Sequence, residues 1–168
     1  MNAQNLFGVS TRVVMWIAGA QDVRIDVAAA GTDSARLTVS WNVAQISFTA
    51  ADQVAHLAGE FRAMTGVSAV LPAQVHPRSI HGNPDQVGPL PIALVTFDRP
   101  RPVTVIPGKT TRDGAVVARW MDVTTGYLSL RVVDKQGWGS LTTALNRAET
   151  IAEAALPARS AERRTPVH

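Results

Sequence analysis

The spacing of the apolar residues changes from two to three or four along the first half of the chain, and this change constrains the fold most. Val23, Ile25 and Val27 alternate with polar residues, which is the pattern of a strand with one buried face. Leu57 and Phe61 belong to a later set that recurs at the spacing of an amphipathic helix. A chain in which strands precede a helix in this way is predicted to be α+β.

The first half is predicted to contain four strands followed by one helix. The strands are expected over residues 13–17, 23–27, 37–41 and 44–48. The helix is expected from about Ala50 to Met64, because Thr49 is a natural N-cap with Asp52 three residues on and Gly66 ends the pattern.

The second half is predicted to repeat this order. Strands are expected over residues 92–97, 103–106, 115–123 and 127–133, with a polar loop over 107–114. A helix is predicted to begin near Ser140 and to end before Pro157. Trp41 and Trp120 both fall in the third strand of their half. Shared ancestry of the two halves and convergence on one layout both stay open.

A proline-rich segment separates the two halves. Five prolines lie between Leu71 and Pro91, and proline removes a backbone donor and restricts the residue before it. We therefore predict one domain over residues 1–168, made of pseudo-repeat halves 12–66 and 92–156. An irregular connector is expected over residues 67–91 and a loose basic tail over 157–168.

The composition bears on cell compartment and chemistry. The chain has no cysteine, which excludes disulfides, a thiol nucleophile and zinc sites of the cysteine type. No apolar run approaches the roughly 20 residues of a membrane span, and no basic cluster precedes an apolar stretch as in a secretory signal. We expect a cytoplasmic protein without membrane attachment.

The motifs do not indicate an enzyme or a cofactor. Residues 107–111 resemble the end of a phosphate-binding loop, but position 103 is not glycine and a strand is expected to follow. His76, His81 and Asp85 lie close together in the connector at a spacing that fits no helical metal site, so exposed loop residues are the favoured interpretation and a metal site the alternative. Residues 137–140 are interpreted as a structural helix entry, with an anion site as the alternative.

The basic charge lies in the second half. The net charge is +3, and residues 91–168 hold eleven Lys or Arg against seven acids. Arg119 and Arg131 are expected in neighbouring strands, where they would form a positive stripe with Lys135 if they share a face. Trp120, one residue from Arg119, is then expected on the opposite face, packed under the helix. The candidate nucleic-acid contacts are Arg99, Arg101, Lys109, Arg112, Arg119, Arg131 and Lys135.

Two tandem ββββα units, with two helices packed on an antiparallel sheet, resemble in topology the whirly and Pur-alpha class of single-stranded nucleic-acid binders. The resemblance covers roughly residues 12–156. It implies a non-enzymatic module that binds single-stranded nucleic acid through a basic sheet face. The alternative is a structural or interaction protein, such as a homo-oligomeric assembly component, an adaptor or a chaperone-like factor, that uses sheet edges or helix faces.

Overall fold

The computed structural model describes residues 13–41, 44–75, 93–97 and 102–157. The strands in these residues are β1 (Val13–Ile17), β2 (Val23–Ala28), β3 (Arg36–Trp41), β4 (Ala44–Phe48), β5 (Ala93–Phe97), β6 (Val103–Arg112), β7 (Ala115–Thr125) and β8 (Leu128–Val132). The helices are α1 (Ala51–Ala63), the 3-10 turn η1 (Val67–Val70) and α3 (Lys135–Ala155). The α+β class and the two amphipathic helices are confirmed.

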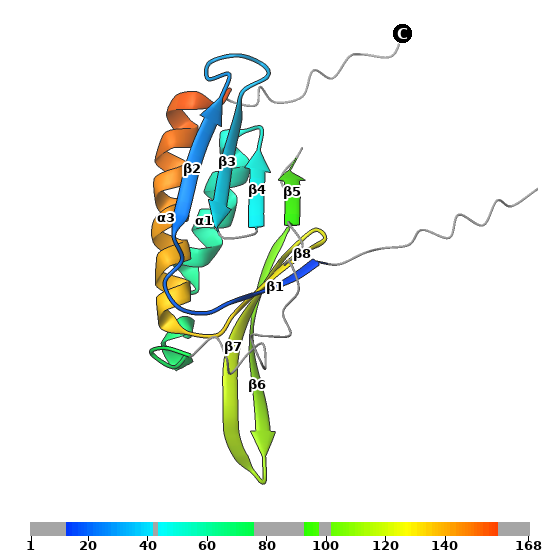
Figure 1. Ribbon diagram of the computed structural model, residues 1–168, viewed down its shortest axis with the longest axis vertical. Coiled ribbons are helices and arrows are strands. Elements are labelled where there is room, and N and C mark those ends of the chain that lie inside the picture. The colour runs from blue at the N-terminus through cyan, green and yellow to red at the C-terminus, as the bar shows by residue number, and fades with distance from the viewer. Residues whose placement is uncertain (1–12, 42–43, 76–92, 98–101, 158–168) are drawn as a thin grey trace, which may run out of the picture.

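The strands form two mixed sheets, so the expectation of one extended antiparallel sheet is wrong. One sheet has the order β2-β3-β4-β5 and the other the order β1-β8-β7-β6 (Figure 1). In each sheet two antiparallel pairs are followed by one parallel pair, β4 with β5 and β1 with β8. The physical reason is the connection: a helix between β4 and β5 returns the chain so that β5 enters parallel to β4. The first strand of each predicted half therefore lies in the sheet of the other half.

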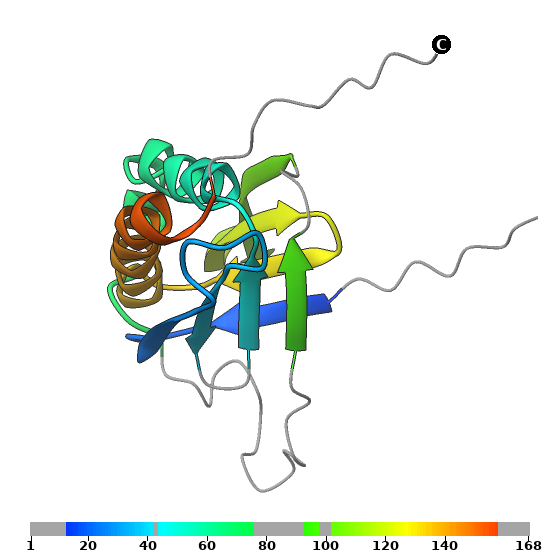
Figure 2. The same cartoon turned by 90° about the horizontal axis from the view of Figure 1, so that it is seen from above.

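Both helices pack against the sheets and against each other, and one hydrophobic core results (Figure 2). Phe61 of α1 stacks on Trp138 of α3, with ring centroids 4.6 Å apart. Leu57 and Phe61 are buried, as expected for the apolar face of the predicted helix, and on α3 Leu145 is buried and Ile151 partly buried. This shared hydrophobic core joins the two sheets.

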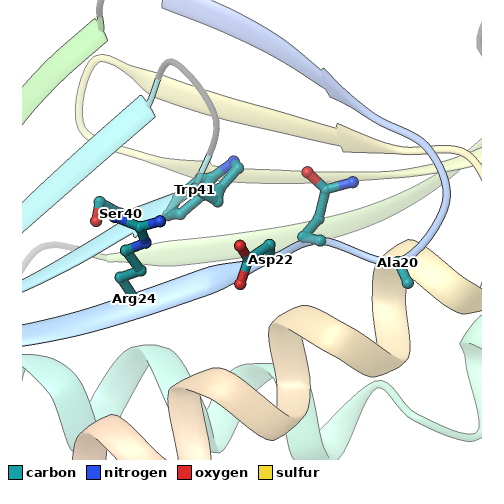
Figure 3. Close-up of a pocket in the computed structure, with 6 residues that line it drawn as sticks. Ala20, Asp22, Arg24, Ser40 and Trp41 are labelled. Atoms are coloured by element: carbon teal, nitrogen blue, oxygen red, sulfur yellow. The ribbon is translucent and has the colours of Figure 1, made fainter.

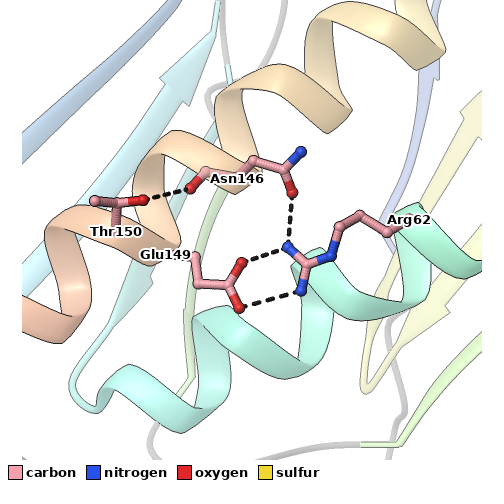
Figure 4. Close-up of polar contacts among 4 residues, drawn as sticks. All are labelled: Arg62, Asn146, Glu149 and Thr150. Carbon is pink, nitrogen blue, oxygen red and sulfur yellow. Dashed lines mark hydrogen bonds and ion pairs between the residues drawn. The ribbon is translucent and has the colours of Figure 1, made fainter.

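A polar contact ties the exposed sides of the two helices together (Figure 4). The guanidinium of Arg62 on α1 donates to both carboxylate oxygens of Glu149 on α3, and it donates to Asn146 Oδ1 at 2.8 Å. The hydrogen bond to Glu149, assisted by the attraction between the charges, raises the pKa of Arg62 above its ordinary value. The pair is exposed, so its contribution to stability is small.

The strand β6 is longer than the sequence predicted. Residues 107–112 were expected in a polar loop, but they continue β6 and pair with β7 through Arg112, with a bulge between Thr110 and Thr111. The chain reverses only at Asp113 and Gly114, which have φ values of 50° and 79°. Cross-strand pairing thus overrides the low strand propensity of this segment, and the hairpin projects from the rest of the molecule (Figure 1).

The helix α3 begins five residues before the predicted start at Ser140. Asp134 is the N-cap, and its carboxylate accepts a hydrogen bond from Gly137 N at 2.7 Å. Gly137 and Gly139 lie in the first turns of the helix and do not precede it, because the buried cap fixes its start. The connector expected to be irregular over residues 67–91 begins with the 3-10 turn η1 at 67–70; residues 71–75 are irregular, and the remainder lies outside the described residues.

Candidate nucleic-acid interface

The structure separates the predicted basic contacts into different places. Lys109 and Arg112 lie on β6, Arg119 on β7, Arg131 on β8, and Lys135 is the first residue of α3. Arg131 is half-buried and the other four are exposed. Arg99 and Arg101 lie outside the described residues.

Arg119 and Arg131 do not share a face of their sheet. Lys109 lies opposite Arg119, and Arg131 lies opposite Asp122. Arg119 and Asp122 are three residues apart on one regular strand, so their side chains point to opposite faces. The predicted stripe is therefore replaced by two groups, one around Arg131 and one on the projecting hairpin.

The outer face of the β1-β8-β7-β6 sheet carries an arginine between two tryptophans. The guanidinium carbon of Arg131 lies 4.9 Å from the ring centroid of Trp16 and 4.7 Å from that of Trp120. Trp16 on β1 is the register partner of Arg131, and Trp120 comes from β7 on the other side. We call Trp16, Trp120, Asp122 and Arg131 the tryptophan platform.

Asp122 fixes the geometry of this platform. Its carboxylate accepts hydrogen bonds from Arg131 Nε at 2.7 Å and Nη2 at 2.8 Å, and from Trp120 Nε1 at 2.9 Å. These hydrogen bonds, helped by the opposite charge and opposed by partial desolvation, raise the pKa of Arg131 above its ordinary value. A bidentate pair of this kind orients the guanidinium plane, so the two rings and the cation form a preorganised surface.

The placement of Trp120 under a helix was wrong. Its indole lies over Gly108 on the neighbouring strand, where an added Cβ would be 2.2 Å from the ring. Met121 and Val123 are the residues of β7 that turn to the core. The alternation of these two with Asp122 was the sequence signal that places Trp120 on the outer face.

Exposed apolar side chains extend the platform along the same face. Val14 is 48% exposed, Trp16 43% and Ile106 58%. Val14 lies two residues from Trp16 on β1, and Ile106 is the register partner of Asp122, so all three share the outer face. Such a group of exposed apolar residues on one sheet face is typical of an interaction surface.

The projecting hairpin, residues 107–119, carries the second basic group. Lys109, Arg112 and Arg119 are exposed on it, and Asp113 at the turn is its one acidic residue. The hairpin is continuous with the strands that carry the platform, and Lys109 and Arg119 point to the face of this ribbon opposite the tryptophans.

A hollow lies on the other sheet, at the start of β2 (Figure 3). It measures about 620 Å³ and is lined by Ala20, Gln21, Asp22, Arg24, Ser40 and Trp41. The amide of Gln21 already donates to the carbonyl oxygens of Ala18 and Gly19. The lining also carries the Asp22 carboxylate, the Arg24 guanidinium and the Ser40 hydroxyl.

The other motifs do not form sites in the described part of the chain. Residues 107–111 lie within β6, and no helix follows them. Residues 137–140 are helical. His76, His81 and Asp85 lie outside the described residues, and within those residues no three His, Asp or Glu side chains gather where they could hold a metal.

No family model matches this chain, and neither the curated proteins nor the solved structures contain a significant match. Within the described residues, neither helix is sufficiently long and apolar to cross a membrane.

Proposed function

We propose that this chain is a non-enzymatic module that binds single-stranded nucleic acid on the outer face of the β1-β8-β7-β6 sheet. The observation that carries the proposal is the tryptophan platform, in which Arg131 lies between Trp16 and Trp120 on an exposed strand surface. Unpaired bases stack on aromatic rings and on guanidinium planes, and this stacking tolerates any base.

The ion pair with Asp122 makes Arg131 a positioning residue for the two tryptophans. A guanidinium whose Nε and Nη2 donate to a carboxylate has little net charge to offer a phosphate, and its carbon lies 4.9 Å from the ring centroid of Trp16 and 4.7 Å from that of Trp120. Trp16 adds an accessible ring beside it, because 43% of this residue is exposed. Each stacked base contributes about 1–3 kcal/mol of binding free energy.

Phosphate contacts are assigned to the projecting hairpin. Lys109 and Arg119 lie opposite each other on the face of the ribbon away from the tryptophans, and Arg112 lies near its turn, so a bound strand would cross the edge of the ribbon to reach both groups. None of the three has an ion-pair partner among the described residues. Each cation that contacts a phosphate releases counterions, so the affinity falls as the salt concentration rises.

Intrinsic tryptophan fluorescence tests the proposal. Trp41 and Trp138 are only 4% and 3% exposed, so quenching by a bound oligonucleotide reports on Trp16 and Trp120. We expect Trp16→Ala to weaken binding of a single-stranded oligonucleotide by about 5- to 150-fold, the equivalent of one stacked base. Tyr127→Ala is the matched control, because Tyr127 is an exposed aromatic residue at the turn between β7 and β8, away from Arg131.

Salt titration separates stacking from phosphate contacts. Lys109→Gln or Arg119→Gln should reduce the slope of log affinity against log salt by about 0.7 per lost contact, whereas Trp16→Ala should leave the slope unchanged. Wild-type protein that binds no oligonucleotide at low salt would refute the proposal. Equal binding of duplex DNA that is insensitive to Trp16→Ala would refute the platform and leave only the hairpin charges.

A further inference from the structure

The strand β2 is an open edge of its sheet. The order β2-β3-β4-β5 leaves one side of β2 without a partner strand in the described part of the chain, and Figure 1 shows β2 beside α3 at that margin. An open edge presents backbone N–H and C=O groups that can pair with another strand. Proteins commonly block such edges with a proline or a bulge, and β2 has neither.

The side chains of β2 form a self-complementary pattern. Arg24 and Asp26 are exposed on the outer face, and neither has a hydrogen-bond or ion-pair partner among the described residues. Val23 and Ile25 are half-buried on the inner face, and Val27 is exposed. One cation and one anion thus flank Ile25 symmetrically.

We propose that the partner of β2 is the β2 strand of a second copy of this chain, paired antiparallel about a twofold axis at Ile25. Each Arg24 then lies opposite the Asp26 of the other copy, and each Val23 lies opposite a Val27. Two ion pairs and a continuous apolar row form at once, and opposite charges directly across a strand pair stabilise the pairing.

The charges of Arg24 and Asp26 favour this register over registers shifted by one or two residues. A shift by two residues in either direction places Arg24 opposite Arg24 or Asp26 opposite Asp26, which is destabilising. A shift by one residue would place the apolar side chains of one copy on the charged face of the other. Only the register centred on Ile25 matches both charge and face.

A groove between β2 and α3 gives the dimer more surface than the strands alone. It measures about 380 Å³, and its lining comes from the start of β2 with the two residues before it and from five residues of α3, which are Gly139, Ser140, Thr143, Ala144 and Arg147. Four of these five helix residues are small, so the groove has room for Val27 of the second copy beside Val23.

Charge reversal tests this register. Light scattering on the wild-type protein should give twice the 17.9 kDa mass of one chain. Arg24→Asp alone, or Asp26→Arg alone, should give the single mass, because each places like charges opposite each other twice. The double variant Arg24→Asp/Asp26→Arg should give the doubled mass again.

Mixing the two single variants tests the register most directly. In a mixed pair the two aspartates of one chain lie opposite the two arginines of the other, so a heterodimer should form although each variant alone is monomeric. Circular dichroism of each variant confirms that it is folded. A monomeric wild-type protein, a dimer that survives Arg24→Asp, or folded single variants that do not associate on mixing would each overturn the proposal.

Discussion

Asp134 is the buried carboxylate on which the junction of three segments depends. It is fully buried, and it accepts hydrogen bonds from Gly19 N at 2.8 Å, Val75 N at 2.9 Å and Gly137 N at 2.7 Å. These donors belong to the segment after β1, to the start of the connector and to the first turn of α3. Replacing Asp134 with Ala leaves all of them without this acceptor.

The expected loss follows from these bonds. Removing an N-cap costs about 1 kcal/mol, and each hydrogen bond to a charged acceptor contributes about 1.5 kcal/mol at the lower limit. Relief of the desolvated charge offsets part of this loss. We expect Asp134→Ala to lower the free energy of unfolding by about 3–5 kcal/mol, a large share of the 5–15 kcal/mol typical of a domain.

Urea unfolding followed by circular dichroism measures this change, with Asp134→Asn as the matched variant. Asn has the same shape and keeps one acceptor oxygen, so it should lose about half as much free energy as Ala does. Hydrogen exchange at the amides of Gly19 and Val75 should accelerate in the Ala variant. A loss under about 1 kcal/mol for Asp134→Ala would show that water or neighbouring groups replace the carboxylate, and the reasoning would fail.

Two further predictions concern α3 and its partner helix. Gly137→Ala should destabilise the protein by about 1–2 kcal/mol, because its Cβ would lie 3.1 Å from both Asp134 Oδ1 and Ile17 Cγ2, whereas Gly139→Ala, with no atom within 4 Å, should stabilise it by up to about 1 kcal/mol. Equal effects in thermal unfolding would contradict this pair. Phe61→Ala should cost about 3–5 kcal/mol in urea unfolding, since Phe61 is fully buried against Trp138, and a smaller loss would show that the core collapses around the cavity.

The sequence predicted most elements because their signals are local. The alternation in β2 and the helical spacing in α1 involve neighbours within a few residues, and both elements lie close to their predicted bounds. The pairing of β1 with β8 joins Val13 to Leu128, and no local pattern specifies such a distant partner. The spacing of apolar residues therefore could not predict that the strands divide into two sheets.

The candidate site was predictable in part. Arg131 was identified as a site residue from charge, but its pairing with Asp122 and its contact with Trp16 depend on strand register. Trp120 does lie on the face opposite Arg119, but it was placed inside because Arg119 was taken to lie on the outer face, whereas the buried Met121 and Val123 show that Arg119 is on the core side of the strand. With β6 extended, Gly108 lies opposite Trp120 and supplies the open surface that the indole covers.

The strand β1 comes from the first half of the chain but pairs in the sheet of the second half, so the proposed site depends on the docking of β1. Trp16 reaches Arg131 only because β1 pairs with β8, and the end of β1 is held by the bonds from Val133 N to Ile17 O and from Gly19 N to Asp134. Among the described residues β1 is an edge strand bonded only to β8, so its release from β8 would remove Trp16 from the platform. A ligand that stacks on Trp16 binds only the docked state and stabilises it by about 2.7 kcal/mol at a hundredfold excess over Kd. The proposed binding therefore depends on the docking of β1, and we expect Asp134→Ala to weaken both.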